Sequence, residues 1–538
     1  MQVGIDLGTT FCCMAYVDDE GQARVIRATG GAATTPSVVW FDGRQAYVGA
    51  RANQLKLTSG EHIYEFVKRD MGRPVEVPPG APEDVGQAAP YQVGGFKYGA
   101  AGISAIILRK LKKEAVAHFK RLGQIDPAAD ERQVDLDAVI TVPAYYGDRE
   151  RQETRLAGYA AGLNVVALVN EPTAAAVSYG LVRPADQRLL VFDLGGGTLD
   201  VTVLRVVDGD LRVVGSVGNN SLGGRDWDAL IEGYLYETFR KRNGRSIPDD
   251  PQRAYEVQEL ALQAKHALSA APEHAVYYSI EEGEIAETLY REAPAGQGAL
   301  QMLRMPPADA FYFDRRSASL LSQCRTLCGN ALVERLPDGE RRPLAWADID
   351  EIVLAGGSCR MPMIPEMLER VSGRKVRRHV EGFDYDTAIA MGAALYGRHR
   401  ARVTDVISHG LGVKLTRGGR AYVEYLLEKD VPLPAEAERV FPADAAAHLE
   451  VYEGESADPD ECVARGQLRL DNPDGRVGIR FHVDRSGLLK VTATYPVGGG
   501  PAAGPVVTRE LRIENDAYLN DSRARLLRER VQAVAINL

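Results

Sequence analysis

The sequence predicts a duplicated α/β domain followed by an antiparallel β-sandwich and one short C-terminal helix. Residues 189–204 have the pattern of a strand, a tight glycine turn and a second strand, and residues 3–17 repeat that pattern early in the chain. Between residues 407 and 514 the apolar runs become short and turn residues frequent, as in a β-sandwich. Because self-similar segments indicate an internal duplication, each hairpin is expected to open one half of the α/β domain.

The two predicted hairpins carry residues suited to bind phosphate. Glycines at positions 195–197 allow the backbone to bring bare N–H groups close to an anion. Asp193 and Asp200 flank them and offer hard oxygen ligands that hold Mg²⁺ through its waters. Such a turn also occurs as a plain hairpin, but the second copy, with Asp6 before its own turn, favours phosphate binding. We therefore expect the two hairpins to hold the phosphates of one nucleotide between them.

Further strands and helices are expected to complete the first half. Asn170 suits the cap of a helix and Pro172 its first turn. Glu171 between them has two interpretations, a carboxylate favoured by the helix dipole or a polar group aimed at the ligand. The pattern predicts strands at 23–26, 38–41, 136–142 and 165–169, a turn at Thr35 and Pro36, and helices at 101–121, whose lysines lie on the face away from the sheet, and at 148–162.

The second half is expected to be mainly helical around its own hairpin. Residues 223–270 read as helix, 350–354 as a strand that runs into a third glycine turn, 386–399 as the last helix of the α/β part and 521–536 as one amphipathic helix. The predicted domains are a nucleotide-binding domain at 1–398, a linker at 399–406, the sandwich at 407–514 and a C-terminal helix at 515–538.

Composition restricts the class of protein. A chain of 538 residues with 45% hydrophobic and 26% charged residues can bury several cores. Its net charge of −10 argues against general binding of nucleic acid or of membrane surfaces. The six cysteines show no paired Cys-x-x-Cys spacing, and the sequence has no run of 18 apolar residues. We expect a monomer in the cytoplasm, without export signal or membrane span.

Seven motifs carry a resemblance to a known family. In chain order they are Gly-Ile-Asp-Leu-Gly-Thr-Thr at 4–10, Thr-Thr-Pro-Ser at 34–37, Val-Pro-Ala-Tyr at 142–145, Asn-Glu-Pro-Thr-Ala-Ala-Ala at 170–176, Phe-Asp-Leu-Gly-Gly-Gly-Thr at 192–198, Leu-Gly-Gly-x-Asp at 222–226 and Ala-Gly-Gly-Ser-x-Arg-Met-Pro at 355–362. Together they resemble the heat shock protein 70 family, the DnaK-type chaperones, over nearly the whole chain.

The resemblance implies an actin-like, ribonuclease H-like ATPase domain with two lobes around a deep cleft, followed by a β-sandwich that binds extended hydrophobic segments of unfolded proteins. It implies ATP and ADP as ligands, with Mg²⁺ and, as a further candidate ion, K⁺. The partners it implies are a J-domain cochaperone and a nucleotide exchange factor. Phosphoryl transfer is mostly positioning and charge neutralisation, so backbone amides, a metal ion and one lysine suffice for such a site.

The resemblance also assigns roles to individual residues. It implies that Lys68 orients the attacking water, whereas Lys68 by itself reads as a surface lysine. The implied catalytic residues are Lys68, Glu171, Asp193, Thr198 and Asp200, and Asp6 and Asp193 are the implied metal positions. The implied nucleotide-binding residues are Gly8, Thr9, Thr10, Phe11, Gly195, Gly196, Gly197, Gly223, Gly224, Lys265, His266, Ser269, Gly356, Gly357, Ser358, Arg360 and Asp386. The nearest matches to the peptide channel are Val413, Leu415, Phe441, Ala447 and Leu449, which equally suit an ordinary sandwich core.

The chain departs from the family pattern in four places. Residues 405–409 replace a leucine-rich linker and lack leucine, so the linker is expected to bury little and to couple the domains weakly. Ala167 stands at a position that is basic in members that dock a J-domain partner. Leu262 and His266 replace the usual Glu and Arg on the nucleoside-binding helix. No long helical lid precedes Leu538, so we expect a short, bacterial-type, lidless chaperone with fast peptide exchange.

Three other functions remain open from the sequence. A sugar or metabolite kinase shares paired Asp-x-Gly-x-Thr hairpins but needs a carboxylate base and no peptide-binding sandwich. An actin-like filament protein has no use for the appended β domain. A regulatory relative that binds ATP with negligible turnover would accommodate Leu262 and His266. The sequence has no Gly-x-x-x-x-Gly-Lys-Ser/Thr motif, which excludes a P-loop.

Overall fold

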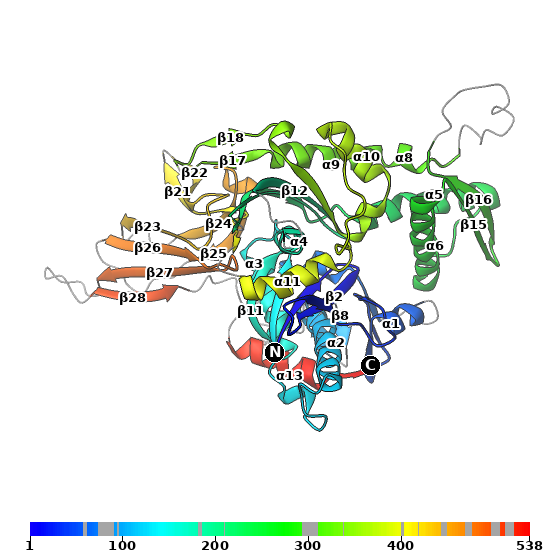
Figure 1. Cartoon of the computed structure of the whole chain (residues 1–538), viewed down its shortest axis with the longest axis horizontal. Coiled ribbons are helices and arrows are strands. Elements are labelled where there is room, and N and C mark those ends of the chain that lie inside the picture. Colours follow the sequence, from blue (N-terminus) through cyan, green and yellow to red (C-terminus); the bar gives the residue numbers. More distant parts are fainter. Residues whose placement is uncertain are drawn as a thin grey trace.

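The computed structural model shows two α/β halves, a β-sandwich and a C-terminal helix and strand (Figure 1). The structure describes residues 1–56, 62–73, 91–93, 96–180, 186–208, 210–292, 310–336, 338–399, 403–417, 419–442, 449–467, 476–496, 506–511 and 521–537.

The first half is built on a mixed sheet with the strand order β11-β10-β1-β2-β3, in which β4 also pairs with β2. Its strands are β1 (Gln2–Leu7), β2 (Phe11–Val17), β3 (Ala23–Val25), β4 (Thr34–Pro36), β10 (Asp137–Val142) and β11 (Asn164–Asn170). The predicted turn at Thr35 and Pro36 is wrong, because these residues form β4, where Pro36 pairs with Phe11. A proline is tolerated there since β4 is a short edge strand.

The second half repeats the arrangement of the first. Its sheet has the order β19-β12-β13-β14-β20, and it contains β12 (Gln187–Leu194), β13 (Leu199–Val207), β14 (Asp210–Asn219), β19 (Glu351–Ala355) and β20 (Val403–Thr404). In both halves a hairpin, β1–β2 or β12–β13, lies beside a parallel strand, β10 or β19. The predicted repetition of the two hairpins is therefore present in the sheets.

Two helices, α4 (Glu171–Gly180) and α11 (Ala388–His399), lie between the two sheets (Figure 1). Glycines allow the backbones to touch there. A Cβ on Gly392 of α11 would lie 1.8 Å from the carbonyl oxygen of Ala174, and a Cβ on Gly4 of β1 would lie 2.1 Å from the amide nitrogen of Ala394. These contacts join both halves directly beneath the two hairpins.

Replacing Gly392 by alanine is expected to destabilise the α/β domain by about 1–3 kcal/mol, because the new methyl group overlaps a backbone carbonyl that cannot move freely. Chemical denaturation of the full chain measures this. The matched control is Gly233→Ala within α5 (Gly224–Asn243), where no heavy atom lies within 4 Å of the new Cβ. That control is expected to gain about 0.5–1 kcal/mol from helix propensity. Equal losses in both variants would contradict the close contact.

Helices cover the outer faces of the two sheets. The outer helices are α2 (Ala100–Arg121) and α3 (Asp148–Ala160) in the first half and α8 (Phe313–Arg316), α9 (Ala318–Ala331) and α10 (Met363–Ser372) in the second. Helices α5 and α6 (Pro251–Ala270) instead pack on each other and on the hairpin at 273–290 (Figure 1). The prediction that all lysines of the first helix face away from the core is wrong for Lys110 and Lys112, which are buried. Lys110 pairs with Glu114 at 2.7 Å, and Lys112 donates to the carbonyl of Gly162 at 2.7 Å, so neither ammonium is left unpaired.

Smaller elements border the two sheets. A small sheet in the first half has the order β29-β6-β5-β7, with β5 (Val39–Phe41), β6 (Gln45–Val48), β7 (Ile63–Tyr64) and β29 (Ala535–Asn537), and α1 (Ala50–Leu55) follows β6. Three hairpins are β8 (Tyr91–Val93) with β9 (Phe96–Tyr98), β15 (Glu273–Ile280) with β16 (Gly283–Tyr290), and β17 (Val333–Arg335) with β18 (Arg341–Pro343).

Two four-stranded antiparallel sheets form the predicted β-sandwich. Their orders are β22-β21-β24-β25 and β23-β26-β27-β28. The strands are β21 (Gly410–Arg417), β22 (Arg420–Leu427), β23 (Ala435–Pro442), β24 (Glu450–Gly454), β25 (Val463–Gln467), β26 (Arg476–Val483), β27 (Leu489–Pro496) and β28 (Val506–Leu511). Alternate residues such as Val477, Ile479 and Phe481 of β26 point inward and are fully buried, which is the period-two pattern of a sheet with one face on a core.

The linker is docked, contrary to the expectation that it has little to bury. Val403 and Thr404 form β20, which pairs in parallel with β14 of the second sheet. The side chains of Val406 and Ile407 are each only 4% exposed. Val403 and Val406 therefore supply apolar contact with the core of the second half, whereas Ile407 lies in the core of the sandwich.

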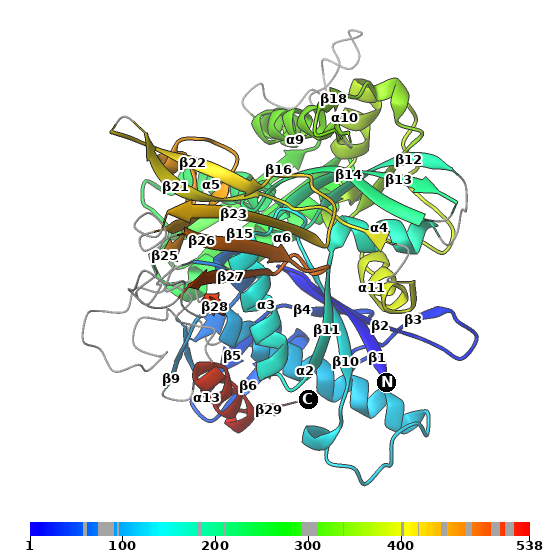
Figure 2. The same ribbon diagram turned by 90° about the vertical axis from the view of Figure 1, so that its left-hand side faces the viewer.

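The C-terminal segment returns to the first half rather than staying with the sandwich. Helix α13 (Asp521–Ala533) packs on α3 and α2, and β29 then pairs in parallel with β6 (Figure 2). The predicted single helix to residue 536 is thus too long, since it ends at Ala533. Leu527, Val531 and Ile536 belong to the hydrophobic core of the first half.

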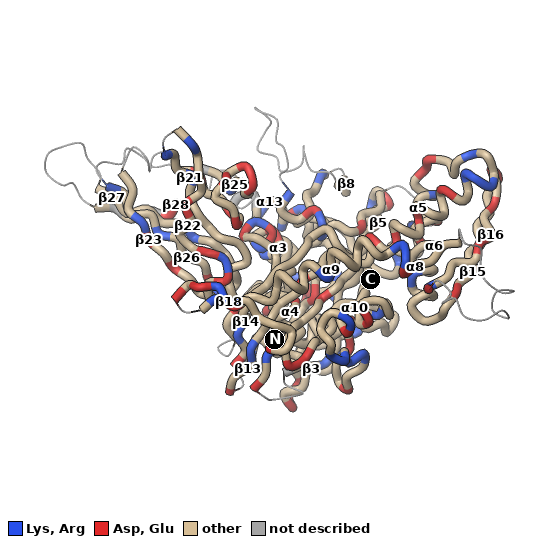
Figure 3. The backbone as a smooth tube through the Cα atoms, turned by 90° about the horizontal axis from the view of Figure 1, so that it is seen from above, with Lys and Arg blue, Asp and Glu red and all other residues tan. Residues whose placement is uncertain are grey.

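The surface carries both signs of charge close together (Figure 3). On the sandwich, for example, Arg480 pairs with Glu438 at 2.7 Å and Lys490 with Glu510 at 2.6 Å. Among the described residues, no helix is long and apolar enough to cross a membrane.

Candidate functional site

The turns of the two hairpins face each other across the two halves. A Cβ on Gly196 would lie 2.4 Å from Oγ1 of Thr10, and one on Gly197 would lie 2.5 Å from Oγ1 of Thr9. Only glycine fits opposite the two threonines at this separation. Gly8 is similarly tight, because its Cβ would lie 2.0 Å from the carbonyl oxygen of Phe11. The residues of both hairpins that were predicted to bind phosphate therefore lie close together. The side chain of Phe11, which was predicted with them, is 47% exposed.

Two further segments close on the triple-glycine turn. The N–H of Gly224, at the start of α5, donates to the carbonyl of Gly195 at 2.9 Å, and the hydroxyl of Ser358 donates to the same carbonyl at 2.9 Å. Gly223 lies so close that a Cβ would be 2.5 Å from the nitrogen of Gly197. Gly356 has φ +78°, and a Cβ there would meet the Leu194 carbonyl oxygen at 2.4 Å. Backbone groups of the turns at 195–197, 223–224 and 356–358 therefore lie next to one another.

An acidic cluster with one lysine lies beneath the turns. Nζ of Lys68 lies 2.5 Å from Oε1 of Glu171, and both side chains are buried. Asp193 and Asp200 are direct cross-strand partners in the β12–β13 hairpin, 3% and 1% exposed. Asp6 stands at the matching place in the first hairpin and is electrostatically coupled to Glu171 and Lys68. Glu171 is both the first residue of α4 and the partner of Lys68, so its aim at a ligand stays a prediction.

Burial and the negative charge of neighbouring carboxylates raise the pKa values of the three aspartates in this cluster. Burial, with the charge of Glu171 next in importance, raises the pKa of Asp6 to about 7 and the pKa of Asp200 to about 7. The same two causes raise the pKa of Asp193 well above its ordinary value. Burial lowers the pKa of Lys68, but the carboxylates of Glu171 and Asp6 outweigh this and raise it overall. A bound cation would therefore stabilise the ionised form of these aspartates.

The carboxylates have free coordination capacity. Oδ2 of Asp193 and Oδ2 of Asp200 are buried without any hydrogen-bond partner. Within the described residues no three His, Cys, Asp or Glu side chains are arranged to ligate a metal ion directly. The donor set therefore fits a cation that retains its water shell, as Mg²⁺ commonly does, and not an all-protein metal cage.

The residues implied for the nucleoside lie on one side of the glycine turns. Lys265 donates to the carbonyl of Gly224 at 3.0 Å and pairs with Asp228 at 2.7 Å. The hydroxyl of Ser269 donates to the carbonyl of Lys265 at 2.8 Å. Burial, followed by the charge of Lys265, lowers the pKa of His266, so this histidine is neutral at pH 7. Lys265 is thus held in place by the protein itself.

Arg360 and Asp386 also meet at this side. Arg360 bonds to Asp386 at 2.8 Å and to Asp384 at 3.0 Å, with its guanidinium 5.3 Å from the centre of the Tyr385 ring. A Cβ on Gly357 would lie 2.8 Å from Oδ1 of Asp386. Arg360 is about half exposed.

Three residues that contact the site were not found from the sequence. Arg69 crosses between the halves, donating to the carbonyl of Gly197 at 3.0 Å and pairing with Asp226 at 2.7 Å. The N–H of Tyr145 donates to Oδ1 of Asp200 at 3.0 Å, and Thr141 donates to Oδ1 of Asp6 at 3.4 Å. The only sequence signal was that Arg69 follows Lys68 and that Tyr145 ends a recognised motif.

Tyr145 also contacts the sandwich. Its hydroxyl donates to Glu455 at 3.3 Å, and its carbonyl oxygen lies 3.1 Å from Nε2 of His409 at the start of the sandwich. Nearby, the buried Arg151 donates to the carbonyl of Ser486 at 3.2 Å, and the N–H of Leu489 donates to Asp148 at 2.8 Å. The residue that holds Asp200 is therefore in direct contact with the β domain.

The implied peptide-channel residues lie inside the sandwich. Val413, Phe441 and Leu449 are buried in its core, and Leu415 packs against that core from a partly buried position. Ala447 lies outside the described residues. Their roles as channel lining stay predictions.

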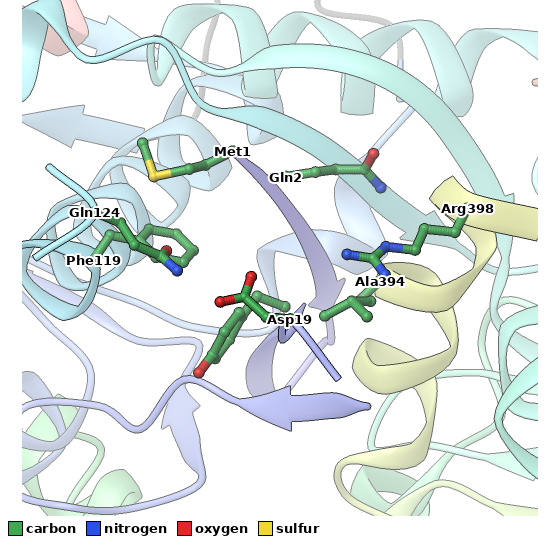
Figure 4. Close-up of a pocket in the computed structure, with 9 residues that line it drawn as sticks. Met1, Gln2, Asp19, Phe119, Gln124, Ala394 and Arg398 are labelled. Carbon is green, nitrogen blue, oxygen red and sulfur yellow. The ribbon is translucent and has the colours of Figure 1, made fainter. Parts of the chain in front are cut away.

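A hollow of about 410 Å³ lies elsewhere, at the start of β1 (Figure 4). Met1, Gln2, Phe119 and Arg398 are among its lining residues. Because Asp6 stands at the other end of β1, this hollow is separate from the acidic cluster.

The chain is similar to known proteins over nearly its whole length. A family model described as "Hsp70 protein" matches residues 2–534. The "Chaperone protein DnaK" of Thermotoga neapolitana is 31% identical over 536 residues, which cover 96% of this chain and 81% of the relative. The "Chaperone protein DnaK" of Prochlorococcus marinus is 33% identical over 517 residues, covering 91% of this chain and 75% of the relative.

Proposed function

Because this chain belongs to the Hsp70 family, we propose that its facing hairpins bind MgATP and that its sandwich binds extended hydrophobic peptide. The chain is an ATP-dependent chaperone of the DnaK type and hydrolyses ATP. The proposed architecture is an actin-like, two-lobed ATPase domain at 1–398, a linker at 399–406, the sandwich at 407–514 and a C-terminal segment at 515–538. The observation that carries the site assignment is the buried acidic cluster beneath two facing glycine turns.

The proposed hydrolytic step depends on position and charge. Backbone N–H groups of Gly8 to Thr10 and of Gly195 to Gly197 bind the phosphates, and Thr198 contributes its hydroxyl. Lys68, held by Glu171, orients the attacking water and neutralises charge on the transferred phosphoryl group. Asp200, oriented by the N–H of Tyr145, accepts hydrogen bonds from that water. These roles are proposed from geometry and from the resemblance.

Asp6 and Asp193 would hold Mg²⁺ through its waters, with Asp193 Oδ2 as the free acceptor. The ion would neutralise the charge of the phosphates and of the cluster itself. K⁺ is proposed as a second cation on the same electrostatic ground, the raised pKa values of the aspartates.

The nucleoside is proposed to bind between α6 and the turn at 356–360. Lys265, Ser269 and neutral His266 would face the ribose, and Arg360 and Gly357 the base. Leu262 and His266 depart from the family pattern at this helix. These two residues are the reason for the alternative of a regulatory protein that binds ATP but hydrolyses little of it. The matched relatives favour neither that reading nor a metabolite kinase, since they are DnaK chaperones aligned over 91–96% of this chain.

The proposed partners are unfolded polypeptides, a J-domain cochaperone and a nucleotide exchange factor, and the proposed state is a cytoplasmic monomer. Six unpaired cysteines are compatible with a reducing compartment. The docked linker and the Tyr145 contacts support coupling between the peptide and nucleotide sites, which the sequence alone had suggested to be weak.

Single-turnover ATP hydrolysis, with and without an extended hydrophobic peptide, tests the proposal. We expect the peptide to stimulate hydrolysis about three- to tenfold, a coupling free energy of about 1 kcal/mol. A peptide of the same length with only polar side chains is the control and is expected to have no effect. Hydrolysis without any response to peptide would leave an ATPase whose two sites act independently. Absence of ATP binding in calorimetry would overturn the site assignment.

A further inference from the structure

The short strand β29 joins the C-terminal segment to the small sheet of the first half. Ala535, Ile536 and Asn537 pair in parallel with Gln45, Ala46 and Tyr47 of β6. The side chain of Ile536 is 8% exposed and lies in the first core, whereas Ala535 and Asn537 face solvent. The strand therefore has one inward side chain and a backbone ladder on an otherwise free sheet edge.

Two basic side chains of α2, the buried Arg109 and the partly buried Lys113, bind the backbone just before β29 and within it. Arg109, only 3% exposed, donates to the carbonyls of Val531 and Val534, both at 2.6 Å. Within the described residues no carboxylate forms an ion pair with Arg109. Lys113 donates to the carbonyl of Ile536 at 3.3 Å. The last carbonyls of α13 thus serve as the acceptors of a buried guanidinium, a strong and directional attachment.

The helix before β29 is attached to the base of the first half. Gln532 donates to the carbonyl of Ala160 at 3.1 Å, and the guanidinium of Arg528 lies 4.8 Å from the centre of the Tyr159 ring. Residues 521–537 consequently connect α2 and α3 at the base to β6 of the small sheet (Figure 2). We call these residues the C-terminal strap.

Residues next to the small sheet also reach the second half, at α6. Lys56, at the end of α1, lies 3.4 Å from Glu65 and 3.9 Å from Glu259 of α6. Gln258 of α6 donates to Glu65 at 2.8 Å. Opening the cleft beside α6 would separate these contacts.

We propose that the C-terminal strap restrains the small sheet through β29 and thereby slows the release of bound nucleotide. In this proposal the small sheet moves relative to α2 and α3 when the cleft opens, and the β29–β6 ladder opposes that movement. The inference rests on the proposed binding of nucleotide between the two halves. It assigns a regulatory role to residues far from the acidic cluster.

Release of a fluorescent ADP, chased with unlabelled ADP, measures the effect in the full chain. Deletion of residues 535–538 and the substitution Ile536→Asp are both expected to speed release about three- to tenfold, as expected when a few hydrogen bonds and one buried side chain no longer oppose opening. The matched control is Ala535→Asp, which adds the same charge at an exposed neighbour and is expected to change the rate less than twofold.

Two outcomes separate the possible failures. An unchanged release rate in the deletion variant, with ADP still bound, overturns the restraint and leaves the nucleotide site intact. If the unmodified chain does not bind ADP at all, the proposed function is overturned instead. Hydrogen exchange at residues 45–48 gives a second readout, because deletion of β29 must increase exchange there if the ladder forms in solution. Should Ile536→Asp fail to fold, Ile536→Ala provides the milder variant.

Discussion

Replacing Lys68 by alanine is expected to lower single-turnover ATP hydrolysis by about 10²- to 10³-fold, the loss seen when one preorganised charge of a transition-state site is removed. Lys68 is the only cation within 4 Å of Glu171 among the described residues, with its Nζ at 2.5 Å. Without it the phosphoryl group loses a neutralising charge and the attacking water loses its orientation. Rapid-quench measurement of a single turnover gives the rate directly.

A matched control separates this effect from general damage to the fold. Lys110 is another buried lysine in an ion pair, at 2.7 Å from Glu114, but it lies on α2 away from the cleft. Lys110→Ala is expected to lower thermal stability and to leave the hydrolysis rate within about twofold, the usual reach of a remote substitution. Similar rates in Lys68→Ala and the unmodified chain would contradict the assigned role of Lys68.

Replacing Asp193 by asparagine is expected to abolish Mg²⁺-dependent hydrolysis and at the same time to stabilise the nucleotide-free protein. Burial, together with Glu171, Asp200 and Asp6, raises the pKa of Asp193, so its charged form is costly in the folded state. A neutral amide removes that cost, by about 1–3 kcal/mol. Thermal unfolding without nucleotide measures this gain in stability. Lower stability of the variant would show that neighbouring groups already stabilise the charged form of Asp193.

The same carboxylates make the stability of the nucleotide-free protein depend on pH. The pKa values of Asp6 and Asp200 are raised to about 7 in the folded state, against 3.8 as the ordinary value. Between about pH 4 and 7 the folded state therefore binds more protons than the unfolded state, and stability falls as the pH rises through this window. Asp200→Asn should weaken this dependence. Asp18→Asn is the control, because Asp18 is held by Arg24 and its pKa is lowered.

Local patterns predicted most of the α/β fold because strands, turns and helix caps are encoded within a few residues. The helix at 148 was predicted from its starting signal, and α3 begins at Asp148. The repeated hairpins were recognised from Asp6, Asp193 and their glycines, whose chemistry is the same in both copies. Thr35 and Pro36 were misread because pairing of an edge strand with β2 outweighs their turn preference.

Contacts between distant segments could not be predicted in this way. Lys110 and Lys112 look like surface residues on a helical pattern, and only Glu114 and the Gly162 carbonyl make their burial tolerable. Arg69 and Tyr145 gained their roles from residues more than 50 positions away, Gly197 and Asp200. The assignment of Lys68 came from a family resemblance, since no local rule distinguishes it from an exposed lysine.

The return of α13 and β29 to the first half has a consequence for how the protein is made. Leu527, Val531 and Ile536 fill the core beside α2 and α3, although they leave the ribosome long after those helices. During synthesis, the apolar surface of α2 and α3 that these residues cover therefore stays exposed while the second half and the sandwich are translated. This nascent chain is thus itself an expected client for other chaperones until residues 521–537 have been translated.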